Sequence, residues 1–247
     1  MRVASLISVV VISMLPGPLA AQGVTIDLGG EGALTLEVVQ LFLLITVLSL
    51  APGIAIMMTC FPFMVTVLSL LRQAVGVQQA PPNMMIVSLA LFLTYFVMAP
   101  VFEQAWDEGV SPMIEGELSA EAGFVATMDP IRQFMEGRVD QTTIVTLQEA
   151  APRSGRSGEP GSAPGDTALS LLVPAFLLSE IKRGFEVGFL IFLPFLIIDL
   201  VVASILMAMG MMMVPPAVVS LPFKLAFFVL ADGWALLAGA LVRGYGA

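Results

Sequence analysis

Histidine is absent from this chain, and cysteine occurs only once, as Cys60. A metal site built on histidine and a disulfide within the chain are therefore both excluded. The sequence also lacks a glycine-rich phosphate loop and the Gly-x-Ser-x-Gly turn that carries a catalytic serine. These absences argue against an intramembrane enzyme, and we expect no catalytic residue, no metal and no cofactor.

Charged residues are also scarce in this sequence. They make up 12% of the 247 residues, whereas soluble domains carry about 25%. Hydrophobic residues make up 58%, and several apolar runs are long enough to cross a membrane as helices. The net charge of −9 argues against nucleic acid as a partner, because phosphates require basic patches. Together with the prolines inside the apolar runs, the composition predicts an all-α, membrane-associated chain with kinked apolar helices and one polar insertion outside the cytoplasm.

Residues 1–21 have the features of a secretory signal peptide. Arg2 supplies the positive start, an apolar stretch follows from Val3 to Leu15, and Ala20-Ala21 offers a cleavage site. Cleavage there would leave the new N-terminus outside the cytoplasm. The alternative is a short anchor that is not cleaved.

Residues 22–102 are expected to form an N-terminal helical region. The apolar run 38–71 is too long for one straight span, and Pro52-Gly53 and Pro62 interrupt it. This pattern predicts helices over about 34–50 and 54–71, with a break between them.

Residues 103–167 form an acidic insertion after a third predicted helix, Met84 to Phe102. From Glu103 to Asp166 there are 12 acidic and four basic residues, a net charge of −8. The scarcity of Lys and Arg is typical of a translocated segment, so we expect the insertion on the periplasmic side. A helix is predicted within 130–147. The tract 151–166, rich in Gly, Ser and Pro without a large apolar residue, is expected to be disordered.

The stretch Gly188–Met213 organises the C-terminal region, residues 168–247. Five of its last seven residues are methionine, and Pro215-Pro216 follows almost at once. Methionine adapts to irregular partners, so such a cluster suits a surface that closes without one fixed partner. Gly210 frees the backbone and the prolines stop the helix, which predicts a projecting loop. The alternative is that the methionines fill gaps in an ordinary core.

A simple topology of four membrane crossings conflicts with the charges in the sequence. The four runs would be 38–71, 84–102, 185–213 and 217–242. Lys182 and Arg183 would then lie on the outer side, against the positive-inside tendency. If the helices face other protein chains more than lipid, the positions of Lys182 and Arg183 and the charges inside the runs are no longer costly. The sequence therefore predicts an assembly. Gly184 and Gly188, four residues apart, predict a close contact between helices in it.

Asp199 lies inside an apolar run, where a charge exposed to lipid would be costly. We expect it to be buried and paired with Lys182 or Lys224, from the same chain or a neighbouring one. Glu180 is assigned to the same set of buried charges. The alternative is that Asp199 takes up and releases protons as a relay.

Two long blocks of the sequence, residues 38–102 and 168–242, match one known family. The first block contains Leu70-Leu71-Arg72-Gln73-Ala74, Ala80-Pro81-Pro82-Asn83 and Met98-Ala99-Pro100-Val101. The second contains Phe176-Leu177-Leu178-Ser179-Glu180-Ile181-Lys182, Leu193-Pro194-Phe195-Leu196-Ile197-Ile198-Asp199 and Met209-Gly210-Met211-Met212-Met213-Val214-Pro215-Pro216. These blocks resemble the FliP family of flagellar biosynthesis proteins, which includes the SctR proteins of virulence type III secretion. The stretch Cys60-Phe61-Pro62-Phe63 departs from the family pattern, because it lacks an arginine usual there.

The resemblance implies a subunit of the flagellar type III protein export gate, without catalysis of its own. Such chains form a homo-oligomeric ring, expected to be pentameric, with FliQ-like and FliR-like subunits in the bacterial inner membrane at the flagellar basal body. The resemblance also implies helical hairpins, with residues 22–102 as an N-terminal hairpin region and residues 168–247 as the region that forms the pore. Unfolded flagellar proteins pass through this pore, and a methionine loop seals it. The loop maps onto Met211, Met212 and Met213, with Met209 beside them. The alternative function is an ion or proton channel subunit that uses Asp199.

Overall fold

A computed structural model of the chain describes residues 36–77, 81–150 and 168–245. Every regular element in these ranges is a helix and none is a strand, which confirms the all-α prediction. The predicted signal peptide, 1–21, and the tract 151–166 lie outside the described residues. The chain divides into two compact units, residues 1–50 and 51–247, and the second contains all the helices from α3 onward.

Helix α2, Leu36–Met57, runs without interruption through Pro52-Gly53. The predicted break at this pair is therefore wrong, and the chain turns instead at Met58–Cys60, just before α3 (Phe61–Val75). A proline inside a helix removes one internal hydrogen bond, which a long helix can tolerate. Pro62, by contrast, occupies the first turn of α3, where the backbone N–H groups have no partner in the helix anyway. The observed turn therefore lies just before Pro62, and Pro52 is accommodated inside α2.

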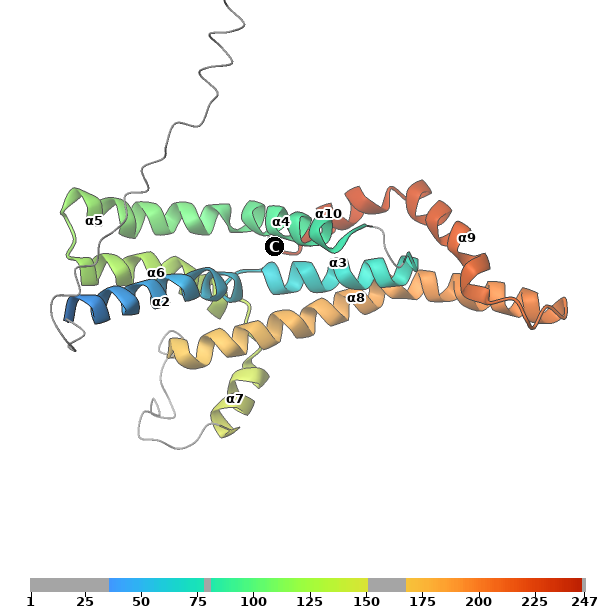
Figure 1. Ribbon diagram of the computed structural model, residues 1–247, viewed down its shortest axis with the longest axis horizontal. Coiled ribbons are helices and arrows are strands. Elements are labelled where there is room, and N and C mark those ends of the chain that lie inside the picture. Colours follow the sequence, from blue (N-terminus) through green and yellow to red (C-terminus); the bar gives the residue numbers. More distant parts are fainter. Residues whose placement is uncertain (1–35, 78–80, 151–167, 246–247) are drawn as a thin grey trace, which may run out of the picture. The chain divides into compact units, whose positions relative to one another are not determined.

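Helix α8, Leu169–Ala208, contains 40 residues and continues through Pro174 and Pro194. In the simple topology the run 185–213 was a crossing of its own, but residues 185–208 are only the second half of this longer helix. Helix α3 lies along α8, and this is the most extensive contact between helices in the second unit (Figure 1). The C-terminal end of α3 is closed by Gly76 in a left-handed conformation, whose N–H donates to the carbonyls of Arg72 and Gln73.

Two glycines allow α8 to approach α3 closely. A Cβ atom at Gly184 would lie 3.0 Å from Cβ of Thr66, and one at Gly188 would lie 2.2 Å from Cδ1 of Leu70. Carbon atoms in contact stay about 3.5–4.0 Å apart, so a side chain at Gly188 would overlap Leu70. The structure thus places the close glycine contact inside one chain, rather than between chains of an assembly.

Gly188→Leu is therefore expected to destabilise the second unit, because Leu70 and the backbone of α3 would have to move. Overpacking of this kind costs typically about 1–3 kcal/mol. The Tm of the protein purified in detergent should fall by several degrees. Gly53→Ala is the matched control, since Gly53 also lies inside an apolar helix but has no atom within 4 Å of its Cβ position. An unchanged Tm for Gly188→Leu would show that the two helices are not in close contact there.

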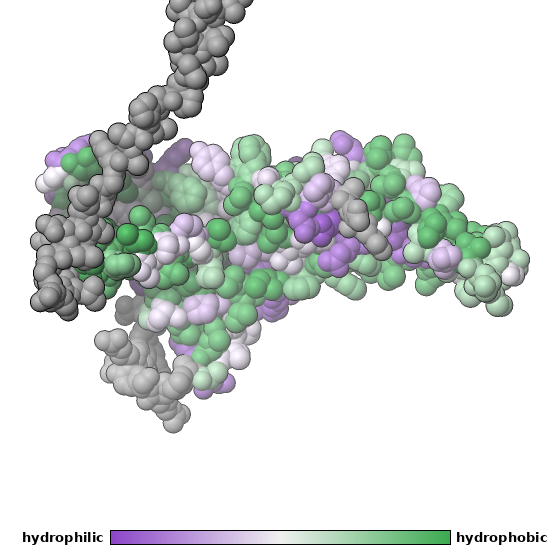
Figure 2. Space-filling model, in the orientation of Figure 1, coloured by the Kyte–Doolittle hydropathy of each residue, from purple (hydrophilic) through white to green (hydrophobic). Residues whose placement is uncertain are grey.

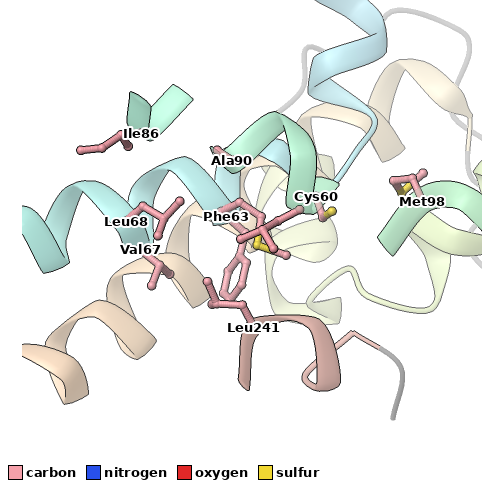
Figure 3. Packing of buried hydrophobic residues seen from close by; sticks show 10 residues of the cluster. Cys60, Phe63, Val67, Leu68, Ile86, Ala90, Met98 and Leu241 are labelled. Atoms are coloured by element: carbon pink, nitrogen blue, oxygen red, sulfur yellow. The ribbon is translucent and has the colours of Figure 1, made fainter. Parts of the chain in front are cut away.

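Helices α3, α4 (Asn83–Ala105) and α10 (Gly233–Arg243) enclose one apolar core, shown in Figure 3. The side chains at its centre are aliphatic, aromatic or sulfur-containing, and all are at most 6% exposed. They include Phe63, Val67 and Leu68 from α3, Ile86, Ala90 and Met98 from α4, and Leu241 from α10. This core brings the last described helix against two helices from the first half of the chain.

The acidic insertion is helical from its first residues. The chain continues beyond the predicted end of the third helix, Phe102, through a π-helical turn, η1 (Trp106–Val110), and α5 (Ser111–Glu115). Helix α6 (Ala120–Glu136) then packs on η1 and α4. A Cβ atom at Gly109 would lie only 2.2 Å from Oγ1 of Thr127, so the approach of η1 to α6 depends on this glycine.

The helix predicted within residues 130–147 is in fact two helices. Helix α6 ends at Glu136, and α7 (Gln141–Ala150) follows after the connection 137–140. Asp140 begins α7, because its Oδ1 accepts a hydrogen bond from the N–H of Thr142 at 3.0 Å. Such a cap satisfies one of the free N–H groups at the start of a helix. The connection therefore ends in a residue that favours a new helix rather than a continuation of α6.

The last apolar run, expected to cross once over residues 217–242, is also two helices. Helix α9 (Pro216–Leu230) and α10 meet at an angle of 61°. Asp232, between them, has a positive φ of 48°, a conformation that Asp tolerates better than most residues. At Gly233 a Cβ atom would lie 2.2 Å from the ring of Phe228, so the bend needs a glycine. In the part of the chain that the structure describes, three helices can cross a membrane by length and composition, or four if this bent pair is one span.

Candidate functional site

The methionine turn, residues 209–215, joins α8 to α9. Gly210 has a positive φ of 74°, and its N–H donates to the carbonyl of Met207 at 3.0 Å. The N–H of Met211 donates to the carbonyl of Leu206 at 2.9 Å. This pair of bonds is a Schellman motif, which ends a helix with glycine in a left-handed conformation. Pro216 is the first residue of α9, where proline is well tolerated, and Pro215 before it is extended.

The methionines of this turn are exposed in the single chain. Met213 is 96% exposed and Met212 84%, whereas Met211 and Met209 are 44% and 60% exposed. Figure 2 shows the projecting end, where α8 meets α9, covered by apolar residues. The alternative that they fill gaps in a core does not hold within one chain. A contiguous apolar surface of this kind is typical of a site that other molecules cover.

Behind the turn, an ion pair connects α8 to α9. Lys224 Nζ lies 2.6 Å from Asp199 Oδ2, and it also donates to the backbone carbonyl of Ala74 at 3.1 Å. The side chain of Lys224 is 7% exposed, as expected for a buried charge, whereas that of Asp199 is 34% exposed, so Asp199 is half-buried rather than buried. Because Ala74 is in the last turn of α3, where carbonyls lack partners within the helix, Lys224 satisfies that helix end as well. Of the two lysines that the sequence left open for Asp199, the structure places Lys224 beside it.

Ser220 completes this group, and the sequence reasoning missed it. Its hydroxyl donates to Asp199 Oδ1 at 2.6 Å, and the residue is fully buried. Ser220 precedes Lys224 by four residues, so the two lie on one face of α9. That spacing was the available signal in the sequence. Both oxygens of the Asp199 carboxylate are therefore engaged by α9, which holds the two ends of the methionine turn together.

Lys182 was assigned to the buried charges, and in the single chain this assignment is wrong. Its side chain is 57% exposed, and its Nζ lies 2.7 Å from Asp140 Oδ2. The hydrogen bond from Lys182, followed by those from Thr142, lowers the pKa of Asp140 from 3.8 to about 2. Lys182 thus attaches α8 to the start of α7 at the protein surface and has no contact with Asp199.

Glu180 is fully buried, as the sequence analysis expected. It belongs to a second polar group, with Arg138 from the α6–α7 connection and Tyr245 after α10. Among the described residues, no cluster of three or more Cys, Asp or Glu side chains is arranged to hold a metal ion.

Long apolar helices, a bent helix pair and charges paired inside the fold define a helical membrane protein. A family model described as the FliP family matches residues 44–241. "Flagellar biosynthetic protein FliP" of Caulobacter vibrioides is 50% identical over 242 residues, which cover 98% of this chain and 89% of that protein. The proteins of the same name from Agrobacterium fabrum and Bacillus subtilis are 44% and 45% identical, and the matches cover 97% and 84% of this chain and 98% and 91% of those proteins. The chain belongs to the FliP family, which implies a role in flagellar export.

Proposed function

We propose that this chain is a subunit of the flagellar protein export gate, and that several copies form a ring whose methionine turns close the pore. Unfolded flagellar proteins would pass through this ring from the cytoplasm, in the inner membrane at the flagellar basal body. The observation that carries the proposal is the exposed methionine turn at the projecting end of the α8–α9 pair. The subunit itself would catalyse nothing.

Physical requirements of an export pore favour methionine at this place. The pore must pass a bulky chain and still exclude ions when idle, and an apolar constriction can do so by excluding water. Methionine is unbranched and polarizable, so it can close around irregular partners. One turn cannot surround a pore, whereas identical chains related by cyclic symmetry can. Met211, Met212 and Met213 of several copies would then meet as apolar rings.

Exposed apolar side chains on the long helices support an assembly with further chains. Phe189, Leu190 and Ile197 of α8 are each more than 60% exposed in the single chain. Lipid can cover some of this surface, and neighbouring copies, FliQ-like subunits and FliR-like subunits would cover the rest. In this arrangement the acidic insertion would lie on the periplasmic side.

The alternative, an ion or proton channel that uses Asp199, has less support. A relay needs a carboxyl group that can take up and release protons. Asp199 is instead held at both oxygens, by Lys224 and by Ser220. This arrangement favours a positioning role for Asp199 over a relay.

A native mass measurement tests the proposed assembly. The chain, tagged at a site that leaves motility intact, should be purified in mild detergent from a flagellated cell that expresses it. We expect a closed complex with several copies of the chain, five by resemblance, together with the FliQ-like and FliR-like chains. A strain without the gene should be non-motile and should regain motility from the tagged copy. A monomer that copurifies with neither partner, under conditions where motility is restored, would contradict the proposal.

A further inference from the structure

The carboxylate of Glu180 is enclosed by residues from distant parts of the chain. Glu180 is 0% exposed. Nε of Arg138 lies 3.4 Å from its Oε1, and the hydroxyl of Tyr245 donates to its Oε2. Burying a carboxylate is costly unless it is paired and hydrogen-bonded. The stability of this part of the fold therefore depends on both partners staying in place.

Tyr245 also holds Arg138 directly. The guanidinium carbon of Arg138 lies 3.7 Å from the centroid of the Tyr245 ring, a cation–π contact. Nη2 of Arg138 also donates a hydrogen bond to the carbonyl of Gly244, next to Tyr245, at 3.5 Å. The side chain of Arg138 is consequently only 12% exposed, although it comes from a short connection between two helices.

The ring of Tyr245 is itself fixed by two phenylalanines. Phe63 of α3 meets it edge-on at a centroid distance of 5.2 Å, and Phe134 of α6 stacks on it at 6.3 Å. Burial, with the nearby Glu180 carboxylate, raises the pKa of Tyr245 far above its usual value, so the hydroxyl keeps its proton and remains a donor. One side chain after α10 thus contacts α3, α6, α8 and the α6–α7 connection.

The same connection has two further contacts with α8, a partly buried hydrogen bond to Ser179 and an exposed ion pair with Lys182. The N–H of Asp140 donates to Oγ of Ser179 at 3.0 Å, and the carboxylate of Asp140 pairs with Lys182. An exposed ion pair stabilises a fold little, because water screens it. The hydrogen bond to Ser179 joins two neutral groups, whereas loss of Arg138 would leave the buried carboxylate of Glu180 without its cation. The contact with Arg138 should therefore contribute most to keeping the connection on α8.

We propose that Tyr245 is a positioning residue that keeps Arg138 on Glu180 and so fixes the α6–α7 connection against α8. Without the ring and the hydroxyl, the guanidinium would move into water, and residues 137–140 would separate from the helix. This role goes beyond the proposed export function, and it does not depend on ring formation or on the methionine turn.

Trypsin can report whether the α6–α7 connection is attached to α8, because it cleaves after arginine and lysine only where the chain is accessible. The purified protein in detergent should be cleaved slowly after Arg138. Tyr245→Ala should increase the rate of that cleavage at least ten-fold. Tyr245→Phe should give an intermediate rate, because the ring over Arg138 remains while the hydroxyl is lost. Mass spectrometry of the fragment that ends at Arg138 gives the rate.

Two control variants separate this effect from unrelated changes. Tyr95→Ala removes the other tyrosine of the chain, which is 67% exposed, and should leave the cleavage after Arg138 unchanged. Lys182→Met removes the surface ion pair of the same connection, and should change the rate less than two-fold. A variant that unfolds as a whole is recognised by cleavage after Lys224, whose side chain is 7% exposed in the folded chain.

Coupling between Tyr245 and Glu180 provides the decisive measurement. If the hydroxyl acts through the carboxylate, Tyr245→Phe should add nothing to the cleavage rate of Glu180→Leu, which leaves the hydroxyl no acceptor at position 180. If the double variant instead shows the product of the two single-variant increases in cleavage rate, the two residues act independently and the proposal is overturned. It is also overturned if Tyr245→Ala leaves the cleavage after Arg138 unchanged, or if cleavage after Arg138 and Lys224 rises in parallel.

Discussion

Replacement of Met211, Met212 and Met213 together by alanine should leave the complex assembled and make the membrane leaky to small ions. Met212 and Met213 are almost fully exposed in the single chain, so they contribute little to its own packing. Alanine is too short to fill the space between copies around a pore, and water would enter the constriction. Ion conductance of planar bilayers that contain the purified complex should rise severalfold.

Replacement of the same three residues by leucine should keep the pore closed but slow export. Leucine is as apolar as methionine, but its branched side chain adapts less well to a passing polypeptide. Motility of the complemented strain measures export. Phe124→Ala is the control, since Phe124 is 64% exposed and belongs to the acidic insertion rather than to the turn. An assembled triple-alanine complex without added conductance would show that these methionines do not seal a pore.

Asp199→Ala should lower the stability of the chain and the yield of its complex. The side chain of Lys224 is 7% exposed, so the substitution leaves a buried ammonium group with only the carbonyl of Ala74 as partner. Removal of one partner of a fully buried ion pair costs typically about 3–5 kcal/mol, and the cost here should be smaller because Asp199 is 34% exposed. Lys224→Met should cost less, because the carboxylate of Asp199 is about one-third exposed and keeps the hydrogen bond from Ser220. The Tm of the purified protein and the amount of complex measure both effects.

Lys182→Met is the matched control for this prediction. Lys182 was the other lysine expected as a partner of Asp199, but it is exposed and forms its ion pair with Asp140. The effect of Lys182→Met on Tm should be small, because exposed ion pairs contribute little. A normal Tm and yield for Asp199→Ala, with loss of proton flux, would favour the relay function that we rank second.

The sequence alone was sufficient for the all-helical class, the membrane character and the end of α8. Helices and their apolar character depend on residues close together along the chain. Gly210 and Pro215-Pro216 likewise act on the backbone next to them, so the predicted turn after the methionines coincides with the observed one. The resemblance of residues 38–102 and 168–242 also pointed to the family that the comparisons show.

The helix boundaries show the limit of such local reasoning. A proline can bend, end or begin a helix, and its neighbours along the chain do not decide between these effects. Pro194 is inside α8, whereas Pro62 is in the first turn of α3. The bend before α10 depends on Gly233, which leaves room for the ring of Phe228. The clash that a larger residue at position 233 would make with this ring is visible only once the two helices are placed in space.

The partners of the charges were decided by the tertiary structure alone. Because α8 is continuous, Lys182 and Asp199 are 17 positions apart on one helix, a distance of about 25 Å along its axis at 1.5 Å per residue. They cannot pair within a chain, and α9 brings Lys224 and Ser220 to Asp199 instead. Glu180 likewise meets Arg138 and Tyr245, which are 42 and 65 residues away in the sequence. The sequence determines which residues are costly to leave unpaired, but the packing of distant helices determines which partners reach them.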